Sequence, residues 1–341
     1  MSALPIIGTL GAGRMGRGIA HAFAYAGHDV VLIDAKQRDA QAAGALRTEA
    51  LAEIRASLAA LADAGAFDAR EIEPMLARVR FAARPEAPAA LASVDVLFEG
   101  VPEVLETKRA ALEFAGAHLR ADAIVASTTS TMLSTQLAGL VARPERFLNC
   151  HWLNPAYLMP LVELSPHEGT ERAVTERMKS LLEAIGKKPV LCKAAPGFIV
   201  PRLQALVMNE AARLVEQGVA SAEDVDRAVR YGFGIRYASM GVVEFIDYGG
   251  LDILYYASHY LAQALGEPRF EPPAIVERYM REGRRGLRDG QGFFDWQAVD
   301  AAAYRRQVLV RQFALLRHLG LAPEAGAALK AQAGSPQQGY S

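Results

Sequence analysis

The sequence predicts an α/β fold in which a mainly parallel sheet, covered by helices, is followed by an all-helical part. Short apolar runs, which are typical of buried strands, alternate with helical patterns up to residue 192. From residue 198 onward, long helical patterns continue and strand candidates are almost lacking. Strands that alternate with helices favour a parallel sheet with both faces covered.

The first elements form a strand–helix–strand pattern. An apolar run at 4–10 ends in glycines and predicts a buried strand. Residues 14–26 carry apolar side chains at helical spacing, and Gly27 ends that helix before a second strand at 29–34. Residues 36–80 are rich in alanine with interspersed arginine and glutamate, which predicts two inserted helices that protrude as a hairpin.

The remaining elements divide into two domains. Apolar runs predict five further strands, at 94–100, 123–128, 146–151, 160–165 and 188–192. The change of pattern predicts a sheet-containing domain at 1–194, an all-helical domain at 195–330 and a disordered, Gly/Pro/Ser-rich tail at 331–341. In the second domain, a helix is expected at 199–217 with its stop at Gly218, and Ser221 with Asp224 predicts the next helix N-terminus.

Composition narrows the class of protein. A chain of 341 residues with 51% apolar and 22% charged residues is typical of a soluble globular protein of two domains. A formal net charge of -1 provides no general attraction for nucleic acid or an anionic membrane, so neither partner is expected. Cys150 and Cys192 are too few for a disulfide framework and lack metal-site spacing, so no metal is expected. Without a signal-like N-terminus or a long apolar run, the protein is expected to be cytoplasmic.

A dinucleotide site is predicted by the stretch GAGRMG. It places Gly11, Gly13 and Gly16 in the G-x-G-x-x-G pattern, directly after a strand and at the start of a helix. The first glycine permits a tight turn, the second lets a pyrophosphate approach the backbone, and the third lets helix and strand pack closely. Asp34, after the second strand, favours NAD over NADP because it accepts from a ribose and repels a 2'-phosphate. The cofactor-binding candidates of this segment are Gly11, Ala12, Gly13, Arg14, Met15, Gly16 and Asp34.

A catalytic pair is predicted in the stretch HWLNPAYLMPLVE. His151 ends one predicted strand and Glu163 ends the next, and ligands bind at the carboxyl ends of strands in such sheets. Histidine suits the removal of a hydroxyl proton near neutral pH, and a carboxylate beside it would fix the tautomer and stabilise the protonated ring. The alternative is a packed histidine with no chemical role.

Six motifs, in order, make the chain resemble the L-3-hydroxyacyl-CoA dehydrogenase family along nearly its whole length. They are GAGRMGRGIA, FEGVPEVLETK, ASTTST, HWLNPAYLMPLVEL, APGFIVPRL and GQGFFDW. The resemblance implies a Rossmann-type NAD-binding domain followed by an all-helical substrate and dimerisation domain. It also implies a homodimer, with His151 as the base and Glu163 as its partner.

The resemblance implies further site residues. Ser130 falls on a hydroxyl position that contacts both substrate and cofactor. Glu103, Lys108 and Asn154 fall on positions that contact the ribose and nicotinamide side of the cofactor, and Asn154 is also a candidate for binding the substrate. Arg288 matches a basic position that reaches the cofactor site of the other subunit in the family's dimers. From the residues alone, Ser130 is one hydroxyl in STTST and Lys108 is one solvated helix lysine.

The chain departs from the family where the substrate is handled. Pro201 stands at a position where the family has an asparagine that holds the substrate carbonyl, and Gln204 is the expected replacement. Proline is tolerated in the first turn of the following helix. Thr128 also replaces a usual asparagine. The segment GIRYASMG resembles the L-gulonate 3-dehydrogenase (lambda-crystallin) branch and, more distantly, carnitine dehydrogenase, so Arg236 is a candidate for binding a substrate carboxylate.

The expected function is the reversible NAD-dependent oxidation of the 3-hydroxyl of a short-chain L-3-hydroxyacyl-CoA. Two alternatives stay open: a dehydrogenase of a free 3-hydroxy acid, such as L-gulonate or carnitine, and an NAD-binding structural protein like the crystallins. A CoA 3'-phosphate needs local cations, and the inserted helices supply Arg47 and Arg55, with no lysine between Lys36 and Lys108. A small-molecule substrate is common to both enzymatic alternatives.

Overall fold

The computed structural model describes residues 4–325. The chain forms two compact units, Met1–Met208 and Asn209–Ser341. The division falls within the helix α8 (Val200–Glu216). The tail for which disorder is expected, 331–341, lies outside the described residues.

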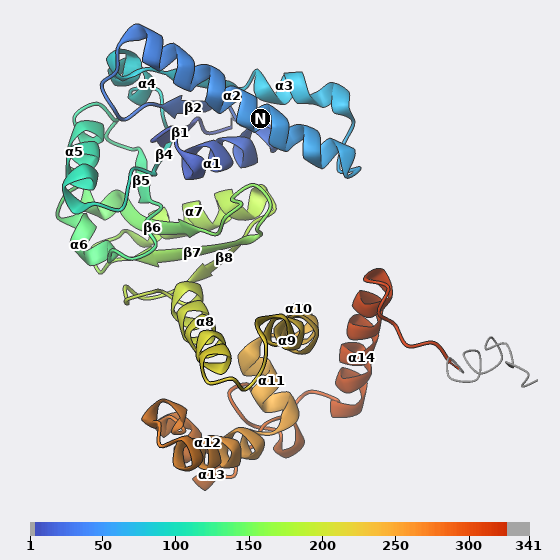
Figure 1. Cartoon of the computed structure of the whole chain (residues 1–341). Coiled ribbons are helices and arrows are strands. Elements are labelled where there is room, and N and C mark those ends of the chain that lie inside the picture. Colours follow the sequence, from blue (N-terminus) through green and yellow to red (C-terminus); the bar gives the residue numbers. More distant parts are fainter. Residues whose placement is uncertain (1–3, 326–341) are drawn as a thin grey trace, which may run out of the picture. The chain divides into compact units, whose positions relative to one another are not determined.

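An eight-stranded sheet forms the centre of the first unit, in the order β3-β2-β1-β4-β5-β6-β7-β8 (Figure 1). All neighbouring strands are parallel except β6 and β7, which are antiparallel. The strands are β1 (Ile7–Leu10), β2 (Val30–Ile33), β3 (Val79–Ala82), β4 (Val96–Glu99), β5 (Ile124–Ser127), β6 (Phe147–Trp152), β7 (Leu161–Pro166) and β8 (Lys188–Leu191). The predicted fold class is therefore confirmed.

Seven of these strands lie where apolar runs predict them, and β3 does not. The end of the segment predicted to be helical, 36–80, enters this strand, which lies at the edge of the sheet. A four-residue edge strand with an exposed Arg80 at its second position has too little apolar periodicity to be recognised. The inserted helices are α2 (Ala40–Asp63) and the shorter α3 (Ile72–Leu76).

Helices cover the sheet because the strands are apolar on both faces. Every residue of β1, β2, β4 and β6 is buried, as expected for central strands of a parallel sheet. The remaining helices of this unit are α1 (Arg14–Tyr25), α4 (Ala87–Leu91), α5 (Leu105–Gly116), α6 (Ser134–Ala138) and α7 (Arg172–Ala184). This rigid sheet holds the loops that carry the candidate site at the carboxyl ends of its strands.

The second unit consists of helices. They are α9 (Ala222–Ala228), α10 (Ile235–Ser239), α11 (Val242–Gly249), α12 (Leu251–Leu265), α13 (Ala274–Arg281) and α14 (Ala301–His318). As predicted, Ser221 caps α9, because its side chain accepts a hydrogen bond from the Asp224 amide at 3.1 Å. None of the helices formed within residues 4–325 has the length and apolar character needed to span a bilayer.

Candidate active site and cofactor site

The loop between β1 and α1 has the geometry that the glycine pattern predicts. Gly11 has a φ of 116°, and a side chain there would meet the Gly100 carbonyl oxygen at 2.8 Å. A Cβ on Gly16 would lie 2.0 Å from the Gly11 carbonyl oxygen, so only glycine lets the helix approach the strand. A Cβ built on Gly13 would meet no atom within 4 Å, and Gly13 precedes α1 as an N-cap residue without a side-chain hydrogen bond. The open space and uncapped amides suit an anionic phosphate at the helix N-terminus.

A cavity of about 400 Å³ lies along this loop and the end of β2. Its walls include the predicted residues Gly11, Ala12, Gly13, Arg14, Met15 and Asp34, while Gly16 lies behind the loop. The Asp34 carboxylate is buried and accepts hydrogen bonds from Arg38 Nε at 2.7 Å and from the Lys36 amide at 3.0 Å. A carboxylate has about four acceptor positions, so Asp34 retains capacity for ribose hydroxyls. The residues present therefore fit the pyrophosphate and adenosine ribose of NAD.

Arg17 is a residue of this site that the sequence pattern does not single out. It is buried, and its Nε donates to the Ala12 carbonyl oxygen at 2.9 Å within the phosphate loop. Its Nη1 pairs with Glu49 at 2.9 Å and with Glu53, both on α2. Arg17 therefore ties the inserted helix to the loop that faces the cofactor.

The structure brings His151 and Glu163 together. They are directly opposite in the antiparallel register of β6 and β7, and the His151 Nδ1 to Glu163 Oε2 distance is 2.7 Å. The other carboxylate oxygen, Oε1, accepts from the amides of Ile199 at 2.9 Å and Val200 at 2.8 Å, at the start of α8. Because an ionised carboxylate only accepts, Nδ1 carries a proton, and Nε2 is the ring nitrogen that remains for other partners.

The environment of Glu163 keeps it ionised. Burial raises the pKa of Glu163, but the hydrogen bonds from His151 and from the Val200 and Ile199 amides outweigh burial and hold the pKa below its usual value. Phe198 covers the imidazole, with ring centroids 5.6 Å apart and a backbone φ of 44°. The APGFIV motif is found by sequence, but the contact of Phe198 with His151 is not.

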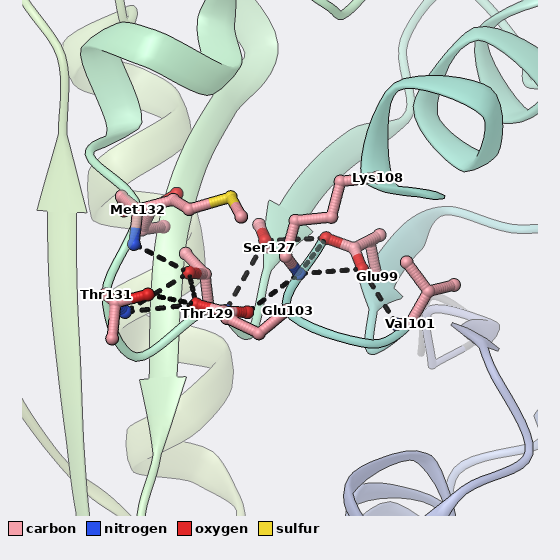
Figure 2. A network of polar contacts seen from close by, with 9 residues as sticks. Glu99, Val101, Glu103, Lys108, Ser127, Thr129, Thr131 and Met132 are labelled. Atoms are coloured by element: carbon pink, nitrogen blue, oxygen red, sulfur yellow. Dashed lines mark hydrogen bonds and ion pairs between the residues drawn. The ribbon is translucent and has the colours of Figure 1, made fainter. Parts of the chain in front are cut away.

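Ser130 lies in the loop after β5, which is tied to the loop after β4 by a polar network (Figure 2). Glu99 and Lys108 are fully buried, and Lys108 Nζ lies 3.0 Å from each Glu99 carboxylate oxygen. The interpretation of Lys108 as a solvated lysine is therefore wrong. Glu103 accepts hydrogen bonds from Thr129 and Thr131, which flank Ser130 in the chain.

The other predicted positions of the first unit are more open. Asn154 is exposed and lines a second cavity, of about 250 Å³, with Tyr157 and Glu53 among its neighbours. Pro201 lies in the first turn of α8, as predicted, and Gln204 is exposed on the same helix.

The two predicted arginines of the second unit each have a partner within that unit. The Arg236 guanidinium lies 4.4 Å from the centre of the Phe245 ring. Arg288 Nη2 lies 2.8 Å from Asp252 Oδ1.

Lys187 holds the loop that follows β6 and carries Asn154. Its buried Nζ donates to the carbonyl oxygens of Ala156 at 2.6 Å, Met159 at 2.8 Å and Tyr157 at 3.3 Å. Burial lowers the pKa of Lys187 to about 8. The sequence offers no signal for this role, because Lys188 beside it looks equivalent and is exposed.

Comparisons with known proteins identify the family to which the chain belongs. The chain matches the NAD binding domain of 3-hydroxyacyl-CoA dehydrogenase at residues 6–195 and the C-terminal domain of that enzyme at residues 197–296. It is 33% identical to 3-hydroxybutyryl-CoA dehydrogenase of Bradyrhizobium diazoefficiens over 86% of this chain and 96% of the relative. It is 30% identical to 5-formyl-3-hydroxy-2-methylpyridine 4-carboxylate 5-dehydrogenase of Mesorhizobium japonicum over 90% of this chain and 97% of the relative.

Solved structures agree with the sequence matches. A 3-hydroxyacyl-CoA dehydrogenase from Archaeoglobus fulgidus superposes with a TM-score of 0.73 at 32% identity, covering 93% of this chain and 100% of that one. With the phosphate loop and the cavity beside Asp34, these matches indicate an NAD-dependent oxidoreductase. The chain belongs to the 3-hydroxyacyl-CoA dehydrogenase family.

Proposed function

We propose that the protein oxidises the 3-hydroxyl of a short-chain L-3-hydroxyacyl-CoA to the 3-ketoacyl-CoA, reversibly, with His151 as general base. The observation that carries this proposal is the buried His151–Glu163 pair, in which Nδ1 is held by the carboxylate and Nε2 is left to accept a proton. Bound NAD supplies the hydride acceptor. Relatives at about a third identity bear names of 3-hydroxybutyryl-CoA and hydroxyacyl-CoA dehydrogenases, which supports the CoA ester.

The side chains of this site divide the work. His151 takes the hydroxyl proton on Nε2, and Glu163 fixes the tautomer and stabilises the resulting imidazolium. Ser130 orients the substrate hydroxyl. The protonated ring then donates toward the forming carbonyl oxygen, an electrostatic effect worth about 3 kcal/mol in comparable sites. Ser130, His151 and Glu163 together favour an enzyme over a crystallin-like NAD-binding protein.

A second candidate is a dehydrogenase of a free 3-hydroxy acid. It is favoured by Pro201, which cannot donate the amide hydrogen bond implied by the family asparagine, and by the Mesorhizobium relative, whose name describes a pyridine carboxylate. In this case we propose that Gln204 and Arg236 contact the substrate. A Gln204→Ala variant that leaves the kinetics of the preferred substrate unchanged would remove Gln204 from this role.

One assay series separates these candidates. NAD reduction is measured with 3-hydroxybutyryl-CoA, L-gulonate, L-carnitine and free 3-hydroxybutyrate under the same conditions. The proposal requires the largest kcat/KM for the CoA ester, and preference for a free acid would select the second candidate. His151→Ala is expected to bind NADH, as followed by fluorescence, and to lose turnover; near-normal turnover would contradict the assignment of the base.

We also propose a homodimer, in which Arg288 reaches the cofactor site of the other subunit, and a cytoplasmic location. The second unit supports the dimer because large apolar side chains remain exposed on it, among them Tyr260 at 70% and Val310 at 66%. Monomeric soluble proteins rarely expose contiguous apolar patches of large area. A monomer by light scattering would remove the cross-subunit role of Arg288.

A further inference from the structure

The Glu103 carboxylate accepts hydrogen bonds from both chain neighbours of Ser130. Its Oε1 accepts hydrogen bonds from the Thr129 hydroxyl, from the Thr131 amide at 3.1 Å and from the Thr131 hydroxyl at 2.8 Å. The Thr129 hydroxyl in turn accepts from the amides of Thr131 at 3.3 Å and Met132 at 3.0 Å. The backbone on either side of Ser130 is therefore fixed through one carboxylate oxygen.

Ser130 itself takes no part in this network. Within residues 4–325 its hydroxyl makes no hydrogen bond, and the residue is only half-buried. Figure 2 shows the Thr129 and Thr131 side chains turned toward Glu103. The hydroxyl that is free to meet a ligand thus lies between two residues whose hydroxyls are occupied.

Lys108 contacts the other oxygen of the Glu103 carboxylate. Its ammonium lies 3.0 Å from both Glu99 oxygens and 3.4 Å from Glu103 Oε2, and its side chain is only 1% exposed. Three carboxylate oxygens therefore surround a group with three donors, so the Glu99 and Glu103 carboxylates can satisfy all of them. Glu99 is held in addition by the Ser127 hydroxyl at 2.6 Å and the Val101 amide at 2.8 Å.

We propose that Glu103, oriented by Lys108, is a positioning residue that sets the place of the Ser130 hydroxyl relative to His151. This inference rests on the proposed function, in which Ser130 contacts the substrate hydroxyl. It differs from the expectation that Glu103 and Lys108 act by touching the cofactor. A displacement of a reacting group by about 1 Å can lower the rate by about 100-fold. Loss of the hydrogen bonds between Glu103 and the Ser130 loop should therefore lower kcat measurably.

A double-mutant cycle on Ser130 and Glu103 tests the proposal, with 3-hydroxybutyryl-CoA and NAD as probes. Ser130→Ala and Glu103→Ala are each expected to lower kcat by about 10- to 100-fold. Because Glu103 acts through Ser130, the double variant is expected to be no slower than Ser130→Ala alone. The NADH dissociation constant, from fluorescence titration, is expected to stay within about twofold for Glu103→Ala. Thr131→Val removes one donor to Glu103 from an exposed side chain and is expected to give a smaller loss of kcat.

The control is Glu106→Gln, in the first turn of α5, the helix that carries Lys108. The Glu106 carboxylate is 77% exposed, and its one ion pair within residues 4–325 is with Arg109. This variant is expected to leave kcat, KM and NADH binding unchanged. Multiplicative losses in the Ser130/Glu103 double variant, or a raised NADH dissociation constant with unchanged kcat at saturating NAD, would overturn the positioning role. If Ser130→Ala alone leaves kcat unchanged, the role of Ser130 in the proposed function fails, and the positioning role fails with it.

If Glu103→Ala does not fold, Thr131→Val and Thr129→Val carry the same cycle with Ser130→Ala. Both keep the ion pairs of Glu103 and Lys108 and remove only one hydroxyl each. Losses of kcat that vanish in the Ser130→Ala background support the proposal, and losses that persist there contradict it.

Discussion

At the scale of single residues, the chemistry depends on how the partner of His151 is held. Glu163 is completely buried, and its two oxygens face one imidazole N–H and two backbone amides. Replacing Glu163 by glutamine would leave a protonated His151 ring without a counter-charge. It would also place the glutamine –NH2, which is a donor, next to groups that are themselves donors. The carboxylate thus both pairs with His151 and accepts from the amides at the start of α8.

We expect Glu163→Gln to lower kcat/KM by about 100-fold or more, because the proton acceptor loses the charge that stabilises it. The pKa of Glu163 in the folded chain lies below its ordinary value of 4.5. Its contribution to stability is therefore present above that pH and lost as the pH falls through the folded pKa. Unfolding curves of the variant are expected to lose this part of the acid dependence. Glu168→Gln, an exposed carboxylate, serves as control, and equal effects of the two changes would contradict the role of Glu163.

Lys187 gives a second test at this scale, in an alkaline window of pH. Its pKa is lowered to about 8 from 10.5, so between these values the unfolded chain holds a proton that the folded chain has released. The contribution of Lys187 to the free energy of unfolding therefore rises with pH across this window. Lys187→Met is expected to be destabilised at pH 7 by about 1 to 3 kcal/mol, because three carbonyls lose their donor. Urea unfolding at pH 7 and pH 10 should show a wild-type advantage that widens with pH, whereas Lys188→Met should show neither effect.

At the scale of elements, a buried carboxylate holds the loop after α13 against α11. Asp247 is 1% exposed and accepts from the amides of Phe293 at 3.0 Å and Phe294 at 2.9 Å and from Trp296 Nε1 at 2.9 Å. A side chain on Gly292 would lie 2.3 Å from this carboxylate, which explains the glycine in the GQGFFDW motif.

We expect Asp247→Asn to destabilise the protein by about 2 to 4 kcal/mol, because an amide can satisfy at most part of three donors and leaves the others unpaired. The measurement is urea unfolding followed by tryptophan fluorescence. Asp295→Asn is the control, since that carboxylate is exposed and, in the described part of the chain, accepts from the Gln297 amide alone. A loss below about 0.5 kcal/mol for Asp247→Asn would contradict a structural role.

The elements also show what the sequence can and cannot predict. Periodicity finds seven strands and the pairing of β6 with β7, because the stretch from His151 to Glu163 has the length of a tight return between two apolar runs. It misses β3, whose four residues carry too little pattern. The hydrogen-bond partners of Glu103, Asp247 and Lys187 lie 26 to 49 positions away in the chain, so no local pattern reveals them. The glycine spacing does predict the loop between β1 and α1, because the three glycines lie close together in the sequence and the pattern depends on local backbone geometry.

At the scale of the whole molecule, the exposed apolar surface of the second unit bears on assembly. Ile253, Tyr256 and Tyr260 on α12 are 64%, 65% and 70% exposed, and their spacing of three and four places them on one face of the helix. A surface helix of a monomer normally turns such a face toward its own core. We therefore propose that a second copy of the chain covers this face in the homodimer.

The replacement of both tyrosines, Tyr256→Lys with Tyr260→Lys, tests this assignment. Light scattering of the native protein is expected to give twice the 36.7 kDa mass of one chain, and the double variant is expected to shift toward the single-chain mass as protein concentration falls. Two buried ammonium groups without partners would cost more than the apolar contact they replace. Gln41→Lys, at an exposed polar position of α2 in the first unit, controls for added charge. If the double variant stays a dimer at every concentration, the second copy does not cover this face, and if the native protein is a monomer, the dimer itself is excluded.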